Sequence, residues 1–265
     1  MKRLDFWALM VLKDDWILSA IEGVRVFAGW FDWSLRRFAR ETRCLLARLQ
    51  TQHALYVVLN GPSVQQQDLS VLKSRDLVFV NRGFLHPLYQ ELHPKFHIFV
   101  DSKMIHGIWS PAWLEQIHEM VPDITFVLPI KWAKHPYFQE YIAKGFNFIW
   151  FPNKGGLRGI GVGGRAFELG FMLNYKEIFF TGFEASGFAQ DLLKQASHFY
   201  GFVDDKELQT PTDIMRGYYM NARQMRELML IAQIAKKKGV RMVNMTEGGL
   251  LGMFERKNIK EINAP

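Results

Sequence analysis

The sequence predicts an α/β protein with a mostly parallel sheet and a helical arm at its N-terminal end. Seven short runs rich in β-branched and aromatic residues alternate with helix-like segments, a pattern typical of a parallel sheet covered on both faces. A length of 265 residues and a hydrophobic content of 49% allow one sizeable core. We therefore expect an arm over residues 1–50 and one large domain over residues 51–265.

The arm is basic and aromatic, and it contains four of the eight tryptophans. Over residues 33–49 the apolar residues fall on one side of a helix, while Arg36, Arg40 and Arg43 recur at spacings of four and three on another. Such a helix suits an anionic membrane surface, where arginines contact lipid headgroups. A helix that packs on its own domain or on a second subunit shows the same pattern, so both interpretations stay open.

The expected domain begins with a short apolar run that ends in Asn-Gly-Pro-Ser. A strand that ends in this way turns tightly at the carboxyl edge of a sheet, where α/β proteins bind ligands. The second and third runs close on Asn81 and Asp101, so these side chains and Asn60 are expected along one edge. The expected strands are 53–60, 76–81, 96–101, 123–128, 147–151, 177–181 and 241–246, and the expected helices are 113–120, 165–173 and 216–238.

A glycine-rich loop precedes the helix expected at 165–173. Six glycines fall between Gly155 and Gly164, and Arg158 lies among them. A glycine backbone can approach a ligand closely and the free amides of a helix start attract anions, so this segment is a candidate phosphate site. A flexible connection without a ligand is the simpler alternative. The long segment 184–217, after the sixth strand, is a candidate lid.

Charge and cysteine content narrow the classes of partner. A formal charge of +7 and a pI of about 9.4 favour anionic partners. A single cysteine, Cys44, excludes an intramolecular disulfide and zinc sites built from cysteine pairs. A chain without disulfides is typical of a reducing cytosol.

We recognise no transmembrane span, no signal peptide and no nucleic-acid module in the sequence, and we expect no nucleic-acid partner. The expected location is the cytoplasm, peripheral to the inner face of the cell membrane.

Several motifs, taken in order, resemble the bacterial family-42 sialyltransferases, which use CMP-activated sialic acid. The resemblance covers about residues 55–255. It implies a GT-A-like, Rossmann-like single domain that transfers an acidic sugar from CMP with inversion and without a metal ion. It rests on Asn60-Gly61-Pro62-Ser63, Asn81, Asp101, the glycine loop with its arginine, Tyr175-Lys176-Glu177-Ile178 before Thr181-Gly182, Ser197-His198 with Gly201, and Met245-Thr246 before Leu250-Leu251-Gly252-Met253-Phe254.

The resemblance also implies a role for each matching residue. His198 matches the general base that removes the proton of the acceptor hydroxyl, and the ordinary histidine pKa of about 6.5 suits that task. Arg158 matches the family's loop arginine with a gap of one residue and would support the leaving phosphate. The expected donor-binding residues are Asn60, Gly61, Ser63, Asn81, Asp101, Gly161, Val162 and Gly163.

Two departures from the family pattern bear on which CMP-linked sugar is the donor. Ser186 stands where the family has a tyrosine that contacts the leaving phosphate, so Ser186 and Tyr200 are candidate leaving-group donors, and Tyr218 or Tyr219 could substitute. Asp101 stands in place of a family asparagine. A CMP-linked sugar other than sialic acid, such as 3-deoxy-manno-octulosonic acid (Kdo), would keep the cytidine site and alter the sugar pocket.

The expected acceptor is a glycan or a lipid-linked molecule, of lipopolysaccharide or capsule type. No cofactor or metal is expected, because the sequence contains no Asp-x-Asp motif. Members of the family commonly form homo-oligomers, and the oligomeric state stays open here. Two other functions also stay open: a pterin pyrophosphokinase-like enzyme on the same fold, and a non-catalytic, membrane-associated binding protein.

Overall fold

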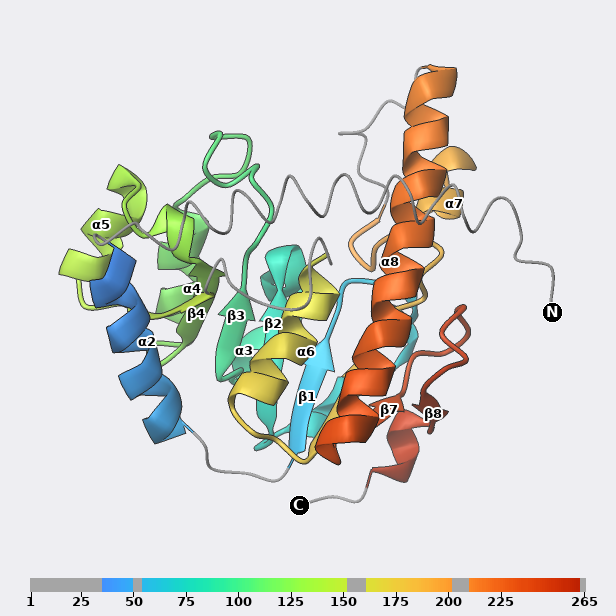
Figure 1. Ribbon diagram of the computed structural model, residues 1–265, viewed down its shortest axis with the longest axis horizontal. Helices are drawn as coiled ribbons and strands as arrows, with labels where there is room; N and C mark the ends of the chain where they lie inside the picture. The colour runs from blue at the N-terminus through green and yellow to red at the C-terminus, as the bar shows by residue number, and fades with distance from the viewer. Residues whose placement is uncertain (1–34, 50–53, 152–160, 202–209, 263–265) are drawn as a thin grey trace, which may run out of the picture.

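The computed structural model describes residues 35–49, 54–151, 161–201 and 210–262, which form a sheet with helices on both faces (Figure 1). The strands are β1 (Ala54–Val58), β2 (Asp76–Val80), β3 (Phe96–Ile98), β4 (Thr125–Pro129), β5 (Asn147–Phe151), β6 (Glu177–Thr181), β7 (Arg241–Asn244) and β8 (Glu255–Arg256). The α-helices are α2 (Arg36–Leu49), α3 (Tyr89–Leu92), α4 (Trp113–Met120), α5 (Pro136–Ala143), α6 (Val162–Met172), α7 (Gly187–Leu192) and α8 (Pro211–Lys238). The short 3-10 helices are η2 (Pro62–Gln66), η3 (Leu69–Leu72), η4 (Asn81–Leu85), η5 (Ile130–Trp132) and η6 (Ile259–Glu261).

The described strands form one sheet in the order β5-β4-β3-β2-β1-β6-β7-β8, and every neighbouring pair is parallel. The chain adds β2 to β5 on one side of β1 and then returns to place β6 on the other side. Val57 of β1 accordingly pairs with Val78 of β2 and with Phe180 of β6. The strand order reverses between β1 and β6, so the crevice outside the carboxyl ends of these two strands is where such a sheet binds ligands. The predicted α/β class and parallel sheet are confirmed.

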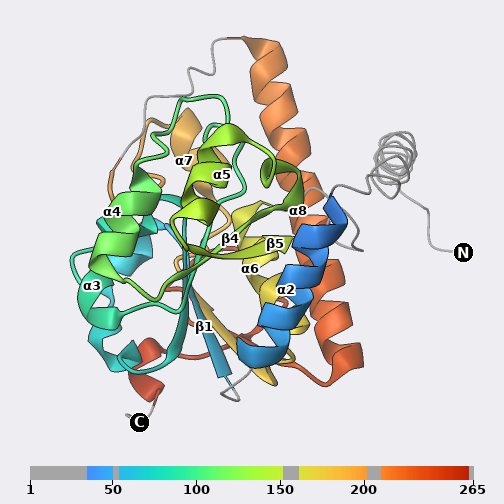
Figure 2. The same cartoon turned by 90° about the vertical axis from the view of Figure 1, so that its left-hand side faces the viewer.

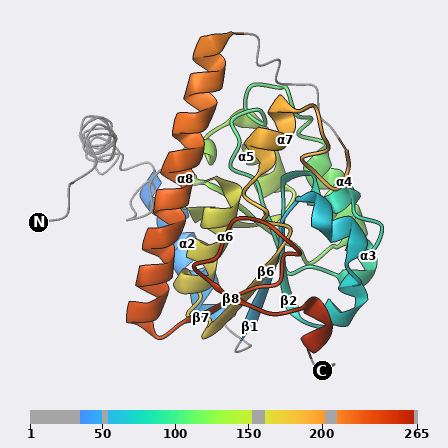
Figure 3. The same cartoon turned by 90° about the vertical axis from the view of Figure 1, so that its right-hand side faces the viewer.

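Alternate residues of each strand face the two helical layers, because successive strand side chains point to opposite faces. Tyr56 lies in the core on the side of α4, and its neighbour Val57 lies in the core on the side of α6 and α8. Figure 3 shows α6 and α8 on one side of the sheet and α3 and α4 on the other. Burial on both faces explains why these strands are continuous apolar runs in the sequence.

Helix α2 lies along β5, the edge strand of the sheet (Figure 2). The buried Phe38 contacts Trp150 edge to face, with ring centroids 5.8 Å apart. The buried Thr42 accepts a hydrogen bond from the backbone N–H of Trp150 through its Oγ1, at 2.9 Å. The described part of the predicted arm therefore packs on the domain and covers a sheet edge, while Arg36 and Arg40 remain exposed.

Residues 1–34 of the predicted arm lie outside the described residues. Within the described part of the chain, no helix is both long enough and apolar enough to cross a membrane.

Candidate active site

A cavity of about 730 Å³ lies at the carboxyl ends of β1, β2, β3 and β6, at the point where the strand order reverses. One wall comes from the residues that follow these strands, and the opposite wall comes from α7 and the first half of α8. The start of α6 closes the cavity between them. Of the residues predicted from the sequence, the cavity is lined by Asn60, Gly61, Asn81, Asp101, Gly161, Val162, Gly163, His198 and Tyr200.

The cavity lining does not include the other predicted site residues that the structure describes. Ser63 is buried in η2 behind the cavity wall, where its backbone N–H donates to Oε1 of Glu184 at 2.8 Å. Ser186 is the residue before α7 and does not line the cavity. Arg158, the predicted loop arginine, lies outside the described residues. Tyr218 and Tyr219 lie on α8 and do not line the cavity either.

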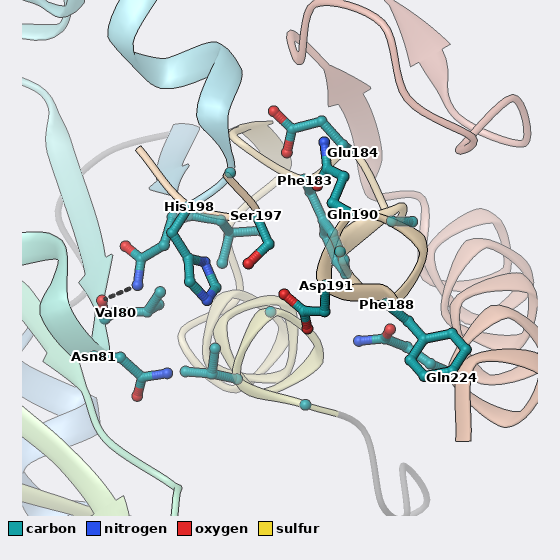
Figure 4. Close-up of a pocket in the computed structure, with 18 of the residues that line it drawn as sticks. Val80, Asn81, Phe183, Glu184, Phe188, Gln190, Asp191, Ser197, His198 and Gln224 are labelled. Carbon is teal, nitrogen blue, oxygen red and sulfur yellow. Dashed lines mark hydrogen bonds between the residues drawn. The ribbon is translucent and has the colours of Figure 1, made fainter. Parts of the chain in front are cut away.

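His198 is positioned by its neighbour Phe199. The backbone N–H of Phe199 donates to the carbonyl of Asn60 at 2.8 Å, its own carbonyl accepts from Gln65, and its ring is buried. The side chains of His198 and Tyr200, one position to either side, line the cavity, and their rings stack with centroids 4.9 Å apart. Figure 4 shows the His198 imidazole, Asn81 and Asp191 directed toward the same space.

Two asparagines present amide oxygens at the cavity wall. The side-chain N–H of Asn60 donates to the carbonyl of Val80 at 3.1 Å, while its Oδ1 is buried and has no partner among the described residues (Figure 4). Oδ1 of Asn81 is also buried without such a partner. Buried polar atoms are normally hydrogen-bonded, so these oxygens are candidate acceptors for a ligand's N–H or O–H groups.

The start of α6 presents free backbone amides. The amides of Gly164 and Arg165 bond back to the carbonyl of Gly161, at 3.0 and 3.4 Å, whereas those of Val162 and Gly163 have no acceptor within the helix. A Cβ on Gly163 would lie 2.8 Å from the ring of Phe183, so glycine is required for this close packing. The helix start attracts a negative charge, such as a phosphate.

Glycines also allow β1 and β6 to meet below the cavity. Gly182 has a φ of +70°, and a Cβ there would lie 2.6 Å from the carbonyl oxygen of Leu59. A Cβ on Gly61 would lie 1.6 Å from Oε2 of Glu184. The buried carboxylate of Glu184 thus lies directly against the Asn-Gly-Pro-Ser turn.

Six charged residues of the cavity were not predicted as site residues, namely Arg82, Lys103, Glu184, Asp191, Asp213 and Arg216. Of these, Arg82 directly follows Asn81, Glu184 lies three residues after the end of β6, and Asp191 lies on α7. Arg82 and Glu184 could have been found by the same signal as Asn60 and Asn81, because they also lie just beyond the carboxyl end of a strand. Asp191 had no such signal, since its helix was not predicted.

No cluster of three or more His, Cys, Asp or Glu side chains in the described part of the chain has an arrangement that could hold a metal ion.

The chain is similar in fold to part of a solved glycosyltransferase. It aligns with the MAf glycosyltransferase from Magnetospirillum magneticum AMB-1 at a TM-score of 0.54 and 10% identity, over 81% of this chain and 35% of that one. The chain thus spans about a third of the length of that protein. No protein-family model matches the sequence, and no curated protein matches it.

Two sialyltransferase structures align with lower scores. One is CstII from Campylobacter jejuni in complex with a substrate analogue, cytidine-5'-monophosphate, with a TM-score of 0.47 and 15% identity over 81% of this chain and 86% of that one. The other is CST-II in complex with a trisaccharide acceptor and CMP, with a TM-score of 0.46 and 15% identity over 76% of this chain and 84% of that one.

Proposed function

We propose that this chain is an inverting glycosyltransferase that moves an acidic sugar, of sialic acid or Kdo type, from a CMP donor to a glycan or lipid-linked acceptor. One observation carries the proposal: a histidine, two asparagines and a helix start surround one cavity at the switch point of the sheet, and the amide oxygens of both asparagines have no partner among the described residues. The order of these groups along the chain resembles the CMP-dependent sialyltransferases, and the fold is similar to part of the MAf glycosyltransferase.

His198 is proposed as the general base. Its imidazole faces the cavity, and the buried Phe199 holds its backbone against Asn60. A base with a pKa near neutrality removes the proton of an attacking hydroxyl as the new glycosidic bond forms at the anomeric carbon. The bond between that carbon and the phosphate of CMP breaks at the same time, on the opposite side of the sugar.

The leaving phosphate is proposed to lie at the start of α6. Negative charge grows on the phosphate as the bond breaks, and the amides of Val162 and Gly163 are fixed donors for such a charge. This arrangement would do the work that a divalent cation does in other transferases, so metal independence is part of the proposal. Asn60 and Asn81 are proposed to bind the cytidine and the sugar through their free amide oxygens.

The acceptor is proposed to reach the enzyme at the inner face of a membrane. Arg36, Arg40 and Arg43 of α2 are exposed on the side of the helix away from Phe38 and Thr42, which bury it on the sheet. Exposed arginines of this kind bind anionic lipid headgroups.

The test is a calorimetric titration of the purified chain with CMP, CDP, UDP and ATP, each with and without magnesium. We expect CMP to bind with an affinity that does not depend on magnesium, and CMP to be released from CMP-sialic acid or CMP-Kdo when a glycan acceptor is added. Magnesium-dependent binding of ATP in place of CMP would contradict the proposal and favour a pyrophosphokinase. CMP binding without release from either donor would favour a non-catalytic binding protein.

A further inference from the structure

Arg82 lies in a group of three aromatic rings at the cavity. Its guanidinium carbon is 5.6 Å from the ring centroid of Trp113, 5.8 Å from that of Tyr200 and 5.9 Å from that of Trp109. Arg82, Trp109 and Tyr200 all line the cavity. Stacking against rings fixes the plane of a guanidinium and leaves its N–H edge available for other contacts.

Two N–H donors in this group have no acceptor among the described residues. They are Nε of Arg82 and Nε1 of Trp109, and both are buried. Trp109 is only 6% exposed. Arg82 also makes no ion pair with a carboxylate in the described part of the chain. A buried donor without an acceptor is costly, so a ligand that accepts hydrogen bonds from both groups would remove that cost.

The charges nearby favour an anionic ligand. Nζ of Lys103 lies 5.7 Å from the ring centroid of Trp109, which places a second cation on the same indole. The carboxylate of Asp101 also lines the cavity, and its Oδ1 accepts from the backbone N–H of Lys103 at 3.0 Å. Arg82 and Lys103 thus contribute two positive charges to this wall of the cavity, and Asp101 contributes one carboxylate.

The position of Arg82 places this group next to His198. Tyr200 contacts both residues, because its ring stacks on His198 and also lies within 5.8 Å of the guanidinium carbon. An anion held by Arg82 therefore lies beside the proposed base, whereas the phosphate is proposed to lie at the start of α6. A planar guanidinium matches the two oxygens of a carboxylate.

We propose that Arg82 and Trp109 form a subsite for the carboxylate of an acidic sugar and make the site selective for such sugars. This subsite rests on the proposed function, since it assumes that a sugar occupies the cavity. The carboxylate could belong to the donor sugar or to an acidic acceptor, and the test separates these two sources.

The test compares binding of sialic acid with that of its methyl ester, which removes the charge and adds one methyl group, by ligand-observed NMR in the presence of CMP. A second arm uses a sialylated trisaccharide and its methyl ester, which represent an acceptor. We expect the wild-type chain to bind at least one acid about 10- to 100-fold more tightly than its ester. Arg82→Gln should abolish this preference. Trp109→Phe, which keeps an aromatic ring and removes the indole N–H, should reduce it.

Arg75→Gln is the matched control. Its guanidinium carbon lies 5.7 Å from the ring centroid of Tyr56, and Arg75 does not line the cavity, so the preference should stay as in the wild type. Preference for the acid in the first arm assigns the subsite to the donor sugar, and preference in the second arm alone assigns it to the acceptor.

Equal binding of acid and ester, binding of neither, or an unchanged preference in Arg82→Gln would overturn the subsite. A CMP titration of the same samples tests the proposed function separately. If CMP fails to bind while the acid is still preferred, the CMP donor is wrong and the carboxylate subsite stands.

Discussion

The imidazole of His97 donates from Nε2 to the backbone carbonyl of Asn81, at 2.8 Å. A carbonyl oxygen can only accept, so Nε2 carries the proton and Nδ1 accepts from the hydroxyl of Tyr89, also at 2.8 Å. Asn81 has a φ of +48°, a left-handed conformation that is uncommon outside glycine. The fully buried His97 thus holds a strained residue whose side chain lines the cavity.

The first prediction concerns pH and stability. Burial lowers the pKa of His97 from 6.5 to about 3, so below pH 6.5 the unfolded chain takes up a proton that the folded chain does not. The stability that the buried, neutral His97 contributes is therefore fully present above pH 6.5. It is lost as the pH falls from 6.5 toward 3, by up to about 1.4 kcal/mol per pH unit. Burial lowers the pKa of His86 in the same direction.

Urea denaturation at a series of pH values from 7.5 to 4.5 measures this dependence. His97→Gln is the comparison, because glutamine has an N–H donor and does not titrate. The variant should show a shallower loss of stability below pH 6.5 than the wild type. The same slope in both proteins would show that His97 is not the group responsible.

The second prediction concerns Gly61. Gly61→Ala should destabilise the protein by about 1–3 kcal/mol, because the new Cβ would collide with Oε2 of Glu184 and would lie 2.6 Å from the carbonyl oxygen of Gly182. Gly252→Ala is the control, since a Cβ there has no neighbour within 4 Å. Thermal unfolding of both variants checks the prediction, and an unchanged melting temperature for Gly61→Ala would contradict it.

The third prediction concerns catalysis by His198. His198→Gln should lower the rate of sugar transfer about 10²- to 10⁴-fold, because glutamine cannot accept the proton of the acceptor hydroxyl. CMP binding, measured by calorimetry, should stay close to that of the wild type. His106→Gln replaces an exposed histidine outside the cavity and should leave both quantities unchanged. Full transfer activity in His198→Gln would remove this residue from the mechanism.

The fourth prediction concerns the contact between α2 and β5. Thr42→Val keeps the shape of the side chain and leaves the buried N–H of Trp150 without its acceptor, which should cost about 1–3 kcal/mol of stability. Thr42→Ser keeps the hydroxyl and should lose much less. Hydrogen exchange at the Trp150 amide gives a local readout, which should become faster in the valine variant alone.

The fold was largely predictable because its strands are buried on both faces. Each of the seven predicted strands is present, since continuous apolar runs closed by polar residues mark them in the sequence. The strand β8 was missed because it has two residues, both exposed, and so no apolar pattern. The short helices α3 and α7 were missed for a related reason, because four and six residues are too few to show a helical period. Helix α5 was also missed, although it has as many residues as the predicted α4.

Part of the site was predictable because its residues directly follow a strand in the chain. Asn60, Asn81 and Asp101 were placed at one edge in this way, and all three line the cavity. The contact between Ser63 and Glu184 joins residues 121 positions apart and depends on β1 and β6 being neighbours. Strand order is set by packing of the whole chain, so local patterns did not reveal it.

The place of β1 in the sheet also has a consequence for synthesis on the ribosome. One edge of β1 pairs with β2, which is made soon after it, but the other edge waits for β6. At about 5–20 residues per second, β6 follows β1 after roughly ten seconds. During that interval the nascent chain carries an unpaired apolar strand edge of the kind that chaperones protect. The cavity cannot exist before β6 docks, so the emerging N-terminal half has no substrate site of its own.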